Sequence, residues 1–289
     1  MDIRAIFMGL SFAFIWSSAF SSARIIVSEA PPLASLSLRF LISGILAVIL
    51  ARMMGQSWHL TRDQWRATFI FGLCQNALYL GLFFVAMQTI EASLASIIAS
   101  VMPLMVAFAG WAFMGDRLRP LAVAGLIAGM IGVVIIMGSR FNGGVDLFGI
   151  VLCVVGTVAL SIATLSMRGA SSGGNLMMIV GLQMFVGAAV LALVSLMLER
   201  IEVHFTWPLV LAFAYTTLAP GVLATWIWFA LVARIGPMRA ATFHFLNPFF
   251  GVAIASALLG EKLGAADIAG VAIIAGGILA VQLSRQTQR

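Results

Sequence analysis

The feature that most constrains this chain is a proline-centred stretch that occurs twice. The first copy covers Glu91–Pro120 and the second covers Gly236–Ala265, so that Pro103 and Pro248 lie 145 positions apart. Without gaps, the same shift pairs Ala95 with Ala240, Ala112 with Ala257, Gly115 with Gly260, Asp116–Arg117 with Glu261–Lys262, Leu118 with Leu263, Gly125 with Gly270 and Gly132 with Gly277. A constant shift of half the chain length indicates an internal duplication.

The composition places the chain in a membrane. Hydrophobic residues make up 62% of the 289 residues and charged residues only 9%, whereas a soluble domain carries about 25% charged residues. We therefore interpret the net charge of +6 as a signal of membrane topology and expect no nucleic-acid partner. The sequence also contains no nucleotide-binding fingerprint in a credible context, so we expect no cofactor.

Ten apolar segments have about the 20 residues that a spanning helix needs. We predict them at Ile3–Ala23, Leu33–Met53, Trp65–Met87, Ala92–Met114, Pro120–Gly138, Leu147–Met167, Leu176–Leu198, Trp207–Ala233, Met238–Leu259 and Ala265–Leu283. The first segment could also be a signal peptide cleaved near Ala23, but its apolar run is longer than a typical signal core. We therefore predict an all-α integral membrane fold with ten transmembrane helices.

The basic residues predict the orientation of the spans. Eleven of the 16 fall on the side of the two termini, four fall on the opposite side, and Arg39 lies within a span. By the positive-inside rule both termini are cytoplasmic. Because each repeat, 1–140 and 141–289, holds five helices, the second repeat enters the membrane from the opposite face. Such inverted repeats are typical of secondary transporters.

Motifs in several spans point to one superfamily. They are the Trp16–Ser17–Ser18 stretch, Arg39–Phe40, Asn76 with Tyr79, the Phe83–Ala86 segment, and the two proline helices that end in GDRL and GEKL. With these motifs the chain resembles the drug/metabolite transporter superfamily, and within it the ten-helix EamA-like carriers that include bacterial amino-acid and metabolite exporters. The resemblance implies a central cavity lined by helices 1, 3, 4, 6, 8 and 9, with helices 5 and 10 at the periphery. It also implies the direction of export.

Polar and aromatic residues within the spans are candidates for that cavity. Asn76, Tyr79 and Phe83 share one face of the third helix, because their spacing is i, i+3, i+7. The full set of candidates is Trp16, Ser17, Asn76, Tyr79, Phe83, Ser161, Thr164, Tyr215, Trp228, His244 and Asn247. The alternative for the aromatic residues is ordinary packing or lipid contact. A roomy, aromatic and modestly polar cavity suits neutral or zwitterionic solutes with an apolar side chain.

The two central prolines have a mechanism of their own. A proline inside a helix lacks an N–H group and clashes with the carbonyl four residues earlier, which is that of Ala99 for Pro103 and that of His244 for Pro248. Unpaired backbone at this depth is tolerated where it is buried or lines a water-filled cavity. The two prolines are thus either hinges beside the cavity or static kinks.

Ionisable groups are nearly absent from the spans. All ten acidic residues fall in loops or at helix ends, whereas a proton- or sodium-coupled carrier usually places a carboxylate in mid-membrane. This pattern favours facilitated diffusion over proton antiport. Arg39 has a structural role or attracts anions, and His244 is either a packed imidazole or a substrate contact and proton carrier.

Metal and disulfide chemistry find no support. Cys74 and Cys153 both lie in apolar segments and are expected to be packing residues, and the three histidines are widely separated, so we expect no metal site. Small residues spaced by four in helices 5 and 10, such as Gly125 with Gly129, predict close helix packing, with a homodimer face as the minor alternative.

Together these observations predict a secondary transporter that exports small neutral or zwitterionic metabolites by alternating access. Amino acids, aromatic or hydrophobic first, are the expected substrates, and the expected surroundings are the lipid bilayer of the cytoplasmic membrane. A monomer is expected, although a homodimer is compatible with the sequence. The alternatives are a proton-coupled multidrug or other metabolite exporter, a nucleotide-sugar carrier, and a membrane scaffold or sensor. An intramembrane enzyme would need a nucleophile–base pair or a carboxylate dyad in the spans, and none is present.

Overall fold

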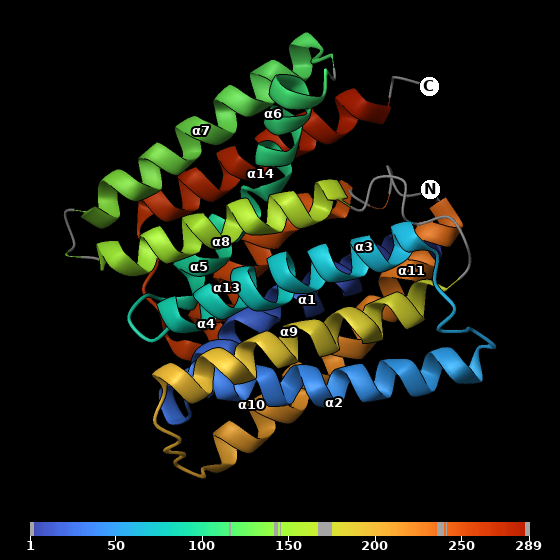
Figure 1. Ribbon diagram of the computed structural model, residues 1–289. Helices are drawn as coiled ribbons and strands as arrows, with labels where there is room; N and C mark the ends of the chain where they lie inside the picture. Colours follow the sequence, from blue (N-terminus) through green and yellow to red (C-terminus); the bar gives the residue numbers. More distant parts are fainter. Residues whose placement is uncertain are drawn as a thin grey trace. The chain divides into compact units, whose positions relative to one another are not determined.

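The computed structural model describes residues 3–115, 117–141, 144, 146–166, 175–235, 240 and 242–286, and all secondary structure in these ranges is helical (Figure 1). The elements are α1 (Ile3–Glu29), α2 (Pro32–Met53), α3 (Arg62–Phe71), η1 (Gly72–Tyr79), α4 (Leu80–Ala86), α5 (Ala92–Ser100), α6 (Met102–Met114), α7 (Pro120–Phe141), α8 (Leu147–Ser166), α9 (Leu176–Leu198), α10 (Trp207–Leu218), η2 (Ala219–Leu223), α11 (Ala224–Ile235), η3 (Thr242–Leu246), α13 (Asn247–Leu259) and α14 (Ala265–Gln286).

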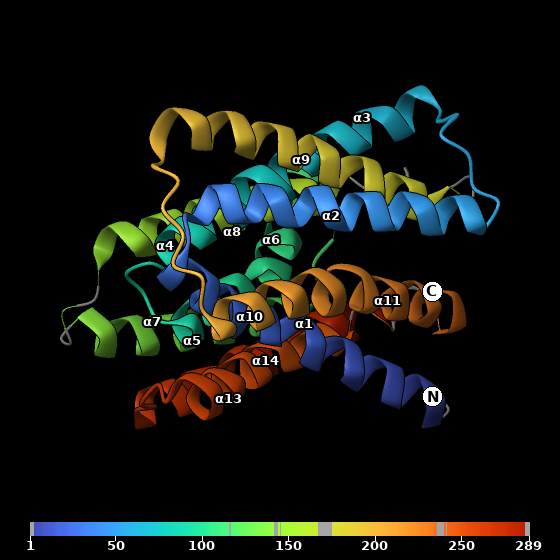
Figure 2. The same cartoon turned by 90° about the horizontal axis from the view of Figure 1, so that it is seen from below.

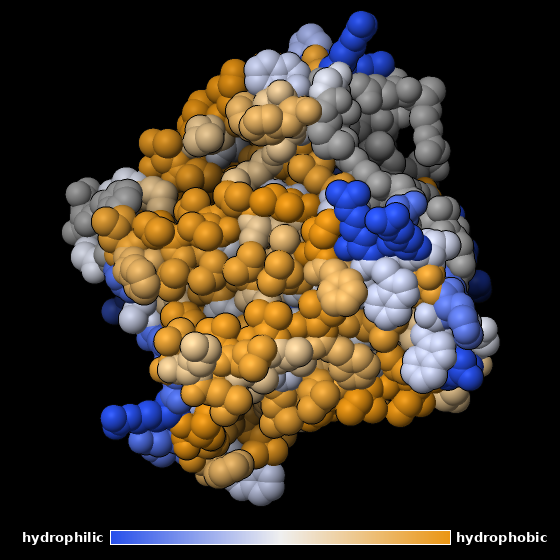
Figure 3. All heavy atoms as spheres, viewed as in Figure 1, coloured by the Kyte–Doolittle hydropathy of each residue, from blue (hydrophilic) through white to orange (hydrophobic). Residues whose placement is uncertain are grey.

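Within the described part of the chain, nine helical stretches are long and apolar enough to cross a membrane, and Phe243–Leu259 forms a shorter tenth. Figure 3 shows hydrophobic side chains along the lengths of α2 and α9 and hydrophilic ones near the helix ends. The predicted ten-helix integral membrane fold is thereby confirmed. The first helix runs on to Glu29, six residues past the predicted end at Ala23. It continues through a charged residue because the Arg24 guanidinium donates to the backbone carbonyl of Met87.

The two sequence repeats recur as structural repeats. The 145-residue shift carries α6 onto α13 and α7 onto α14 with identical boundaries. Gly115 and Gly260, which the same shift pairs, end α6 and α13 in the left-handed region with φ of 72° and 68°. Glycine suits this position because it has no Cβ that would clash in a left-handed cap.

The helices form two compact units, and each unit contains helices from both repeats. The first unit comprises 1–21, 89–147 and 223–289, and the second comprises 22–88 and 148–222. The first unit therefore holds the two proline-centred stretches together with α7 and α14. The second holds α2, α3, η1, α4, α9, α10 and most of α8.

In the first unit, α7 packs along α14 through two symmetric glycine contacts (Figure 1). A Cβ added to Gly125 would lie 2.6 Å from the Gly277 carbonyl oxygen, and one added to Gly277 would lie 2.6 Å from the Gly125 oxygen. Gly132 and Gly270 face each other in the same way, at 2.9 Å in both directions. The 145-residue shift pairs Gly125 with Gly270 and Gly132 with Gly277, so it relates one contact to the other. Contacts related in this way are typical of an isologous two-fold interface. The equivalent helices are therefore antiparallel, which is the inverted relation of the two repeats.

In the second unit, α2 packs antiparallel to α9, and the two helices lie side by side in both ribbon views (Figure 2). A Cβ added to Gly44 would lie 3.2 Å from the Gly181 carbonyl oxygen, and one added to Gly181 would lie 3.1 Å from the Gly44 oxygen. The Ser37 hydroxyl donates to the Ala188 carbonyl at 2.8 Å. Small residues thus let the two backbones approach closely, as they do in membrane helix pairs.

The third and eighth helices share an irregularity. Each contains a π-helical segment, η1 in the third and η2 in the eighth, and the 145-residue shift carries η1 over η2. Wide π turns in α-helices are rare and occur frequently at functional sites. Here they recur at equivalent positions of both repeats, so we regard them as a built-in property of the fold.

Candidate functional site

The predicted cavity residues divide between the two units. Those of the first unit are Trp16, Ser17, Trp228, His244 and Asn247, together with the candidate hinges Pro103 and Pro248. Those of the second unit are Asn76, Tyr79, Phe83, Ser161, Thr164 and Tyr215, together with Arg39. A central cavity shared by both groups stays a prediction.

An aromatic cluster of the first unit surrounds His244. The ring of Phe12 lies 5.7 Å from Trp16, 4.8 Å from Trp228 and 5.3 Å from the imidazole, measured between ring centroids. Trp228 and His244 lie 5.2 Å apart. Trp16, Trp228 and His244 are half-buried. Sequence reasoning did not single out Phe12, because it is one of 21 phenylalanines in the chain.

A short polar chain links α1 to the start of α13. The Ser17 hydroxyl donates to the backbone carbonyl of Asn247 at 3.2 Å, and the Asn247 side-chain nitrogen lies 3.0 Å from Nδ1 of His244. An amide nitrogen can only donate, so with the amide placed this way Nδ1 accepts and the imidazole is in its neutral Nε2–H form. Three of the predicted residues are thus brought together at one place.

Both proline helices are interrupted. The fourth helix breaks at Val101, whose N–H reaches the Ile98 carbonyl at 3.2 Å, and it restarts as α6 with Pro103 in the first turn. In the ninth helix the 3-10 turn η3 leads into α13, which has Pro248 in its first turn. A proline in a first helical turn removes no hydrogen bond, because the N–H groups there lack helical partners. Because of the break, each proline lies in a first helical turn, where proline is tolerated. A hinge role for Pro103 and Pro248 stays a prediction.

The two proline helices meet in an antiparallel pair, α5 with α13. Both oxygens of Glu261, which follows α13, accept from the first backbone N–H groups of α5, at 2.8 Å from Ala92 and 2.9 Å from Ser93. A carboxylate at this place satisfies two free N–H groups and complements the positive end of the helix dipole. We call this contact the Glu261 clasp.

Further along the pair, polar atoms are buried without partners. A Cβ on Gly251 would overlap the side chain of Ser96, so the two backbones are in close contact there. Among the described residues, no partner reaches the hydroxyls of Ser21, Ser93 and Ser96 or the side-chain oxygen of Asn247. Each such group costs about 1–3 kcal/mol relative to a satisfied one. We call Ser93, Ser96, Asn247 and Gly251 the polar seam.

Sequence reasoning identified only Asn247 of this seam. Serine and glycine at helix contacts are common in membrane proteins, so Ser93, Ser96 and Gly251 carried no distinguishing signal. Glu261 was recognised as part of the GEKL motif, but its capping role depends on a helix 169 positions away in the chain. An available signal was the repeat itself, because it predicts that the end of helix 9 and the start of helix 4 lie on the same side of the membrane.

In the second unit, the third-helix residues lie at a buried contact. The Asn76 side-chain nitrogen donates to the Gln183 carbonyl at 3.0 Å, and the rings of Tyr79 and Phe83 are 4.6 Å apart. A Cβ on Gly156 of α8 would lie 2.9 Å from the Phe83 ring, so α8 packs directly on this aromatic pair. Asn76, Tyr79 and Phe83 are all buried.

The remaining predicted residues of this unit have local partners or are exposed. The hydroxyls of Ser161 and Thr164 donate to carbonyls one turn earlier in α8, while Tyr215 is 38% exposed. Arg39 is buried, its Nε donates to the Thr216 carbonyl at 3.3 Å, and its guanidinium lies 5.3 Å from the centroid of the Phe40 ring.

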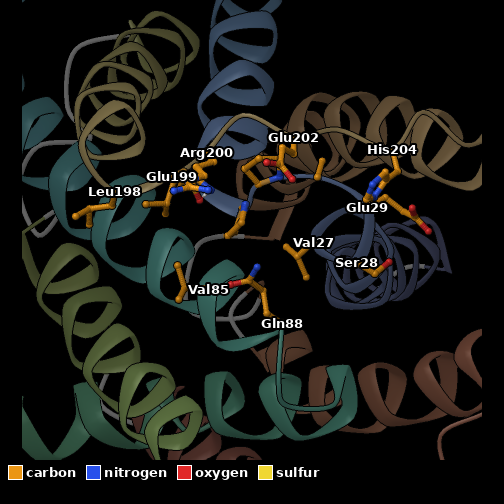
Figure 4. A pocket seen from close by; sticks show the side chains of 14 residues that line it. Val27, Ser28, Glu29, Val85, Gln88, Leu198, Glu199, Arg200, Glu202 and His204 are labelled. Carbon is orange, nitrogen blue, oxygen red and sulfur yellow. Dashed lines mark hydrogen bonds between the residues drawn. The ribbon is translucent and has the colours of Figure 1, made fainter.

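A pocket of about 500 Å³ opens beside the α1–α2 turn of the second unit (Figure 4). Its lining includes the charged residues Glu29, Glu199, Arg200 and Glu202 and the imidazole of His204. Figure 4 shows Glu29 next to His204 on one side and Glu199 next to Arg200 on the other. Glu199 has a structural role, because its oxygens accept hydrogen bonds from the N–H groups of Leu33 and Ala34 at 2.8 and 2.9 Å. The sequence did not predict this pocket, since helix ends and loops that are far apart in the chain form it.

The described part of the chain contains no group of three side chains able to hold a metal ion. Its two cysteines, Cys74 and Cys153, are both free. The site therefore offers hydroxyl, amide, imidazole and aromatic groups, which recognise solutes by hydrogen bonding and shape.

Comparisons with known proteins agree with this architecture. The profile of the EamA-like transporter family matches residues 3–138 and 147–283. The chain therefore belongs to the EamA-like transporter family and is a transporter with two repeats. A solved crystal structure with a TM-score of 0.70 and 20% identity covers 98% of this chain and 99% of its own, which shows the fold.

Similar curated proteins are transporters of low sequence identity. The transporter YvbV of Bacillus subtilis is 25% identical over 95% of this chain and 90% of its own length. A probable amino-acid metabolite efflux pump of Salmonella typhimurium is 24% identical over 94% and 92%. The aromatic amino acid exporter YddG of Ancylobacter novellus is 26% identical over 48% of each chain.

Proposed function

We propose that this protein exports amino acids or closely related zwitterionic metabolites by alternating access, with aromatic and hydrophobic amino acids as the first candidates. The observation that carries the proposal is the pair of inverted proline helices, interrupted at equivalent positions and packed against each other in one unit. Inverted repeats allow a carrier to open to either side by exchanging the conformations of its two halves.

The chemistry of the predicted residues supports the choice of solute. Phe12, Trp16 and Trp228 offer aromatic surface beside a neutral imidazole, and Asn247 offers an uncharged oxygen acceptor. The named functions of the Salmonella pump and of YddG point to the same solutes. An apolar side chain would contact the rings, while the polar head group would use the hydroxyl and amide groups.

We also propose the setting in which the transporter works. It lies in the cytoplasmic membrane with both termini in the cytoplasm, as the distribution of arginines indicates. It acts as a monomer on a small-molecule substrate, without nucleic acid, cofactor or catalytic activity. Cavity and hinge roles for the predicted residues belong to the same proposal.

Counterflow in proteoliposomes tests the substrate. Vesicles preloaded with an unlabelled amino acid should accumulate the same labelled amino acid, and a panel of amino acids would rank the substrates. Empty vesicles and vesicles with an unrelated membrane protein provide the background. If no amino acid in the panel exceeds that background, the amino-acid proposal fails, whereas the fold and the family stand.

The coupling mode is tested with the same vesicles. We propose facilitated diffusion, because no carboxylate lies in mid-membrane and the His244 imidazole accepts a hydrogen bond from Asn247 in its neutral form. Transport should therefore run without a pH gradient, and His244→Ala should leave its pH dependence unchanged. Transport that needs a pH gradient, and loses this need in His244→Ala, would establish proton coupling instead.

A further inference from the structure

We propose that the polar seam between α5 and α13 is the binding site for the ammonium group of the transported solute, held shut in this conformation by the Glu261 clasp. This inference rests on the proposed transport function. It adds a residue-level site on α5, a helix in which no candidate substrate residue had been identified. It also gives Glu261 a positioning role.

The first argument is the hydrogen-bonding balance of the seam. Ser93 and Ser96 are fully buried and Asn247 is 91% buried, and no described residue hydrogen-bonds the hydroxyls or the Asn247 side-chain oxygen. The amide nitrogen of Asn247 is already used by His244, so its oxygen can only accept. The seam therefore holds two hydroxyls that can each accept or donate and one oxygen that needs a donor, and buried groups of this kind normally have partners.

The second argument concerns the chemical class of the missing partner. An ammonium group can donate to the Asn247 oxygen, which only accepts, and to serine hydroxyls, which can also accept. The four seam residues carry no side-chain charge, so they offer neutral oxygens to an ammonium group. An amino acid carries its own carboxylate, and neutral oxygens therefore suit it.

The third argument concerns access. The seam is closed by contact of Ser96 with Gly251, and it can admit a solute only if α5 and α13 move apart. The Glu261 clasp opposes this movement, because it ties the end of α13 to the first turn of α5 through two hydrogen bonds. A bound state and a closed state thus compete for the same helices.

The experiment measures how fast a cysteine in the seam reacts. Ser93→Cys is labelled in proteoliposomes with methanethiosulfonate ethylammonium, and mass spectrometry reads position 93 separately from Cys74 and Cys153. Glu261→Gln removes one acceptor and the negative charge of the clasp. We expect it to raise the labelling rate at position 93 roughly tenfold, the factor that about 1.4 kcal/mol supplies.

Two matched controls separate opening from general loosening. Glu199→Gln makes the same chemical change at the equivalent cap of α2, and Lys262→Gln changes the exposed neighbour of Glu261. Neither should change labelling at position 93 by more than about twofold, because neither touches the clasp. If Glu199→Gln accelerates labelling as much as Glu261→Gln, or if Glu261→Gln has no effect, the proposal is wrong.

Ligand protection tests the site itself. In the Glu261→Gln background, L-phenylalanine or methylammonium should slow labelling at position 93, whereas N-acetyl-L-phenylalanine and sodium chloride of equal ionic strength should not. If neither L-phenylalanine nor methylammonium protects, the ammonium site is refuted. Protection by methylammonium in a protein that shows no amino-acid counterflow would instead refute the proposed substrate and leave the site intact.

Discussion

The antiparallel pairs α2–α9 and α5–α13 are capped in the same way and differ along their contact. In each pair both oxygens of a glutamate accept from two backbone N–H groups at a helix start, at 2.8 and 2.9 Å. In α2–α9 the seam hydroxyl of Ser37 has a carbonyl partner. In α5–α13 the hydroxyls of Ser93 and Ser96 have none among the described residues.

This difference indicates that the two helix pairs, although capped in the same way, have different roles. A satisfied seam loses its hydrogen bonds and its close packing when it opens, so α2–α9 is suited to remain closed. An unsatisfied seam gains hydrogen bonds when water or a solute enters, so opening α5–α13 recovers part of the lost contact energy. The two pairs have similar glutamate caps but different seams. The α2–α9 pair would then be the rigid part, and the α5–α13 pair the moving part.

The strongest test of the comparison is the cap of the closed pair. Glu199→Gln should lower the stability of the folded protein by about 1.5–3 kcal/mol, the range for hydrogen bonds to charged groups, because we expect the satisfied α2–α9 pair to stay closed. Thermal unfolding in detergent measures the effect. Glu261→Gln should cost clearly less stability, since α5–α13 can part instead. Equal losses for the two variants would remove the distinction between the pairs.

The next effect comes from the glycine contact of α7 with α14. Gly277→Ala would place a Cβ 2.6 Å from the Gly125 carbonyl oxygen, and because a backbone atom cannot rotate away, we expect a loss of about 1–3 kcal/mol. Gly276→Ala is the matched control, since nothing lies within 4 Å of its added Cβ. If the Gly277→Ala protein unfolds at the same temperature as the Gly276→Ala control, this contact is loose.

A similar substitution in the polar seam should behave differently. Gly251→Ala would bring its Cβ within 2.6 Å of the Ser96 Cβ, and the pair can relieve this overlap by parting. We expect faster labelling of Ser93→Cys with only a small loss of stability, by contrast with Gly277→Ala.

A second substitution gives the control for that effect. Ser96→Gly removes the overlapping side chain, so the double variant with Gly251→Ala should return labelling toward the parent rate, which a double-mutant cycle quantifies. Persistent fast labelling in the double variant would mean that Gly251→Ala acts through another contact.

Much of this fold could be predicted from the sequence, because the length of the apolar segments and the internal repeat can both be seen in the residue pattern. Apolar length gave ten spans, and the structure places the seventh at the predicted Leu176–Leu198. The 145-residue shift predicted that Gly115 and Gly260 are equivalent, and both adopt the same left-handed cap. The helix breaks were signalled by Pro103 and Pro248, although the restart of each helix at the preceding residue depends on packing.

The candidate site was less predictable because its residues are defined by partners far away in the chain. Asn247 and His244 stood out as polar residues in an apolar span. Ser93 and Ser96 become distinctive only when α13 is placed against them and their hydroxyls are found without partners. Local patterns cannot show which small polar residue lacks a partner, because a partner can lie far away in the chain, as the Asn247 carbonyl lies 230 positions from the Ser17 hydroxyl that donates to it.

The smallest predicted effect has opposite signs in the two pairs. Ser37→Ala should destabilise the protein by about 0.5–1.5 kcal/mol, because it breaks a satisfied hydrogen bond and leaves the Ala188 carbonyl without that donor. Ser96→Ala should stabilise the closed protein by a similar amount, because it removes a buried hydroxyl that has no partner among the described residues. Thermal unfolding should thus move down for one variant and up for the other, and counterflow should slow in Ser96→Ala because the closed seam becomes harder to open. If Ser96→Ala is destabilising, the seam is satisfied in the closed protein and the two pairs are alike.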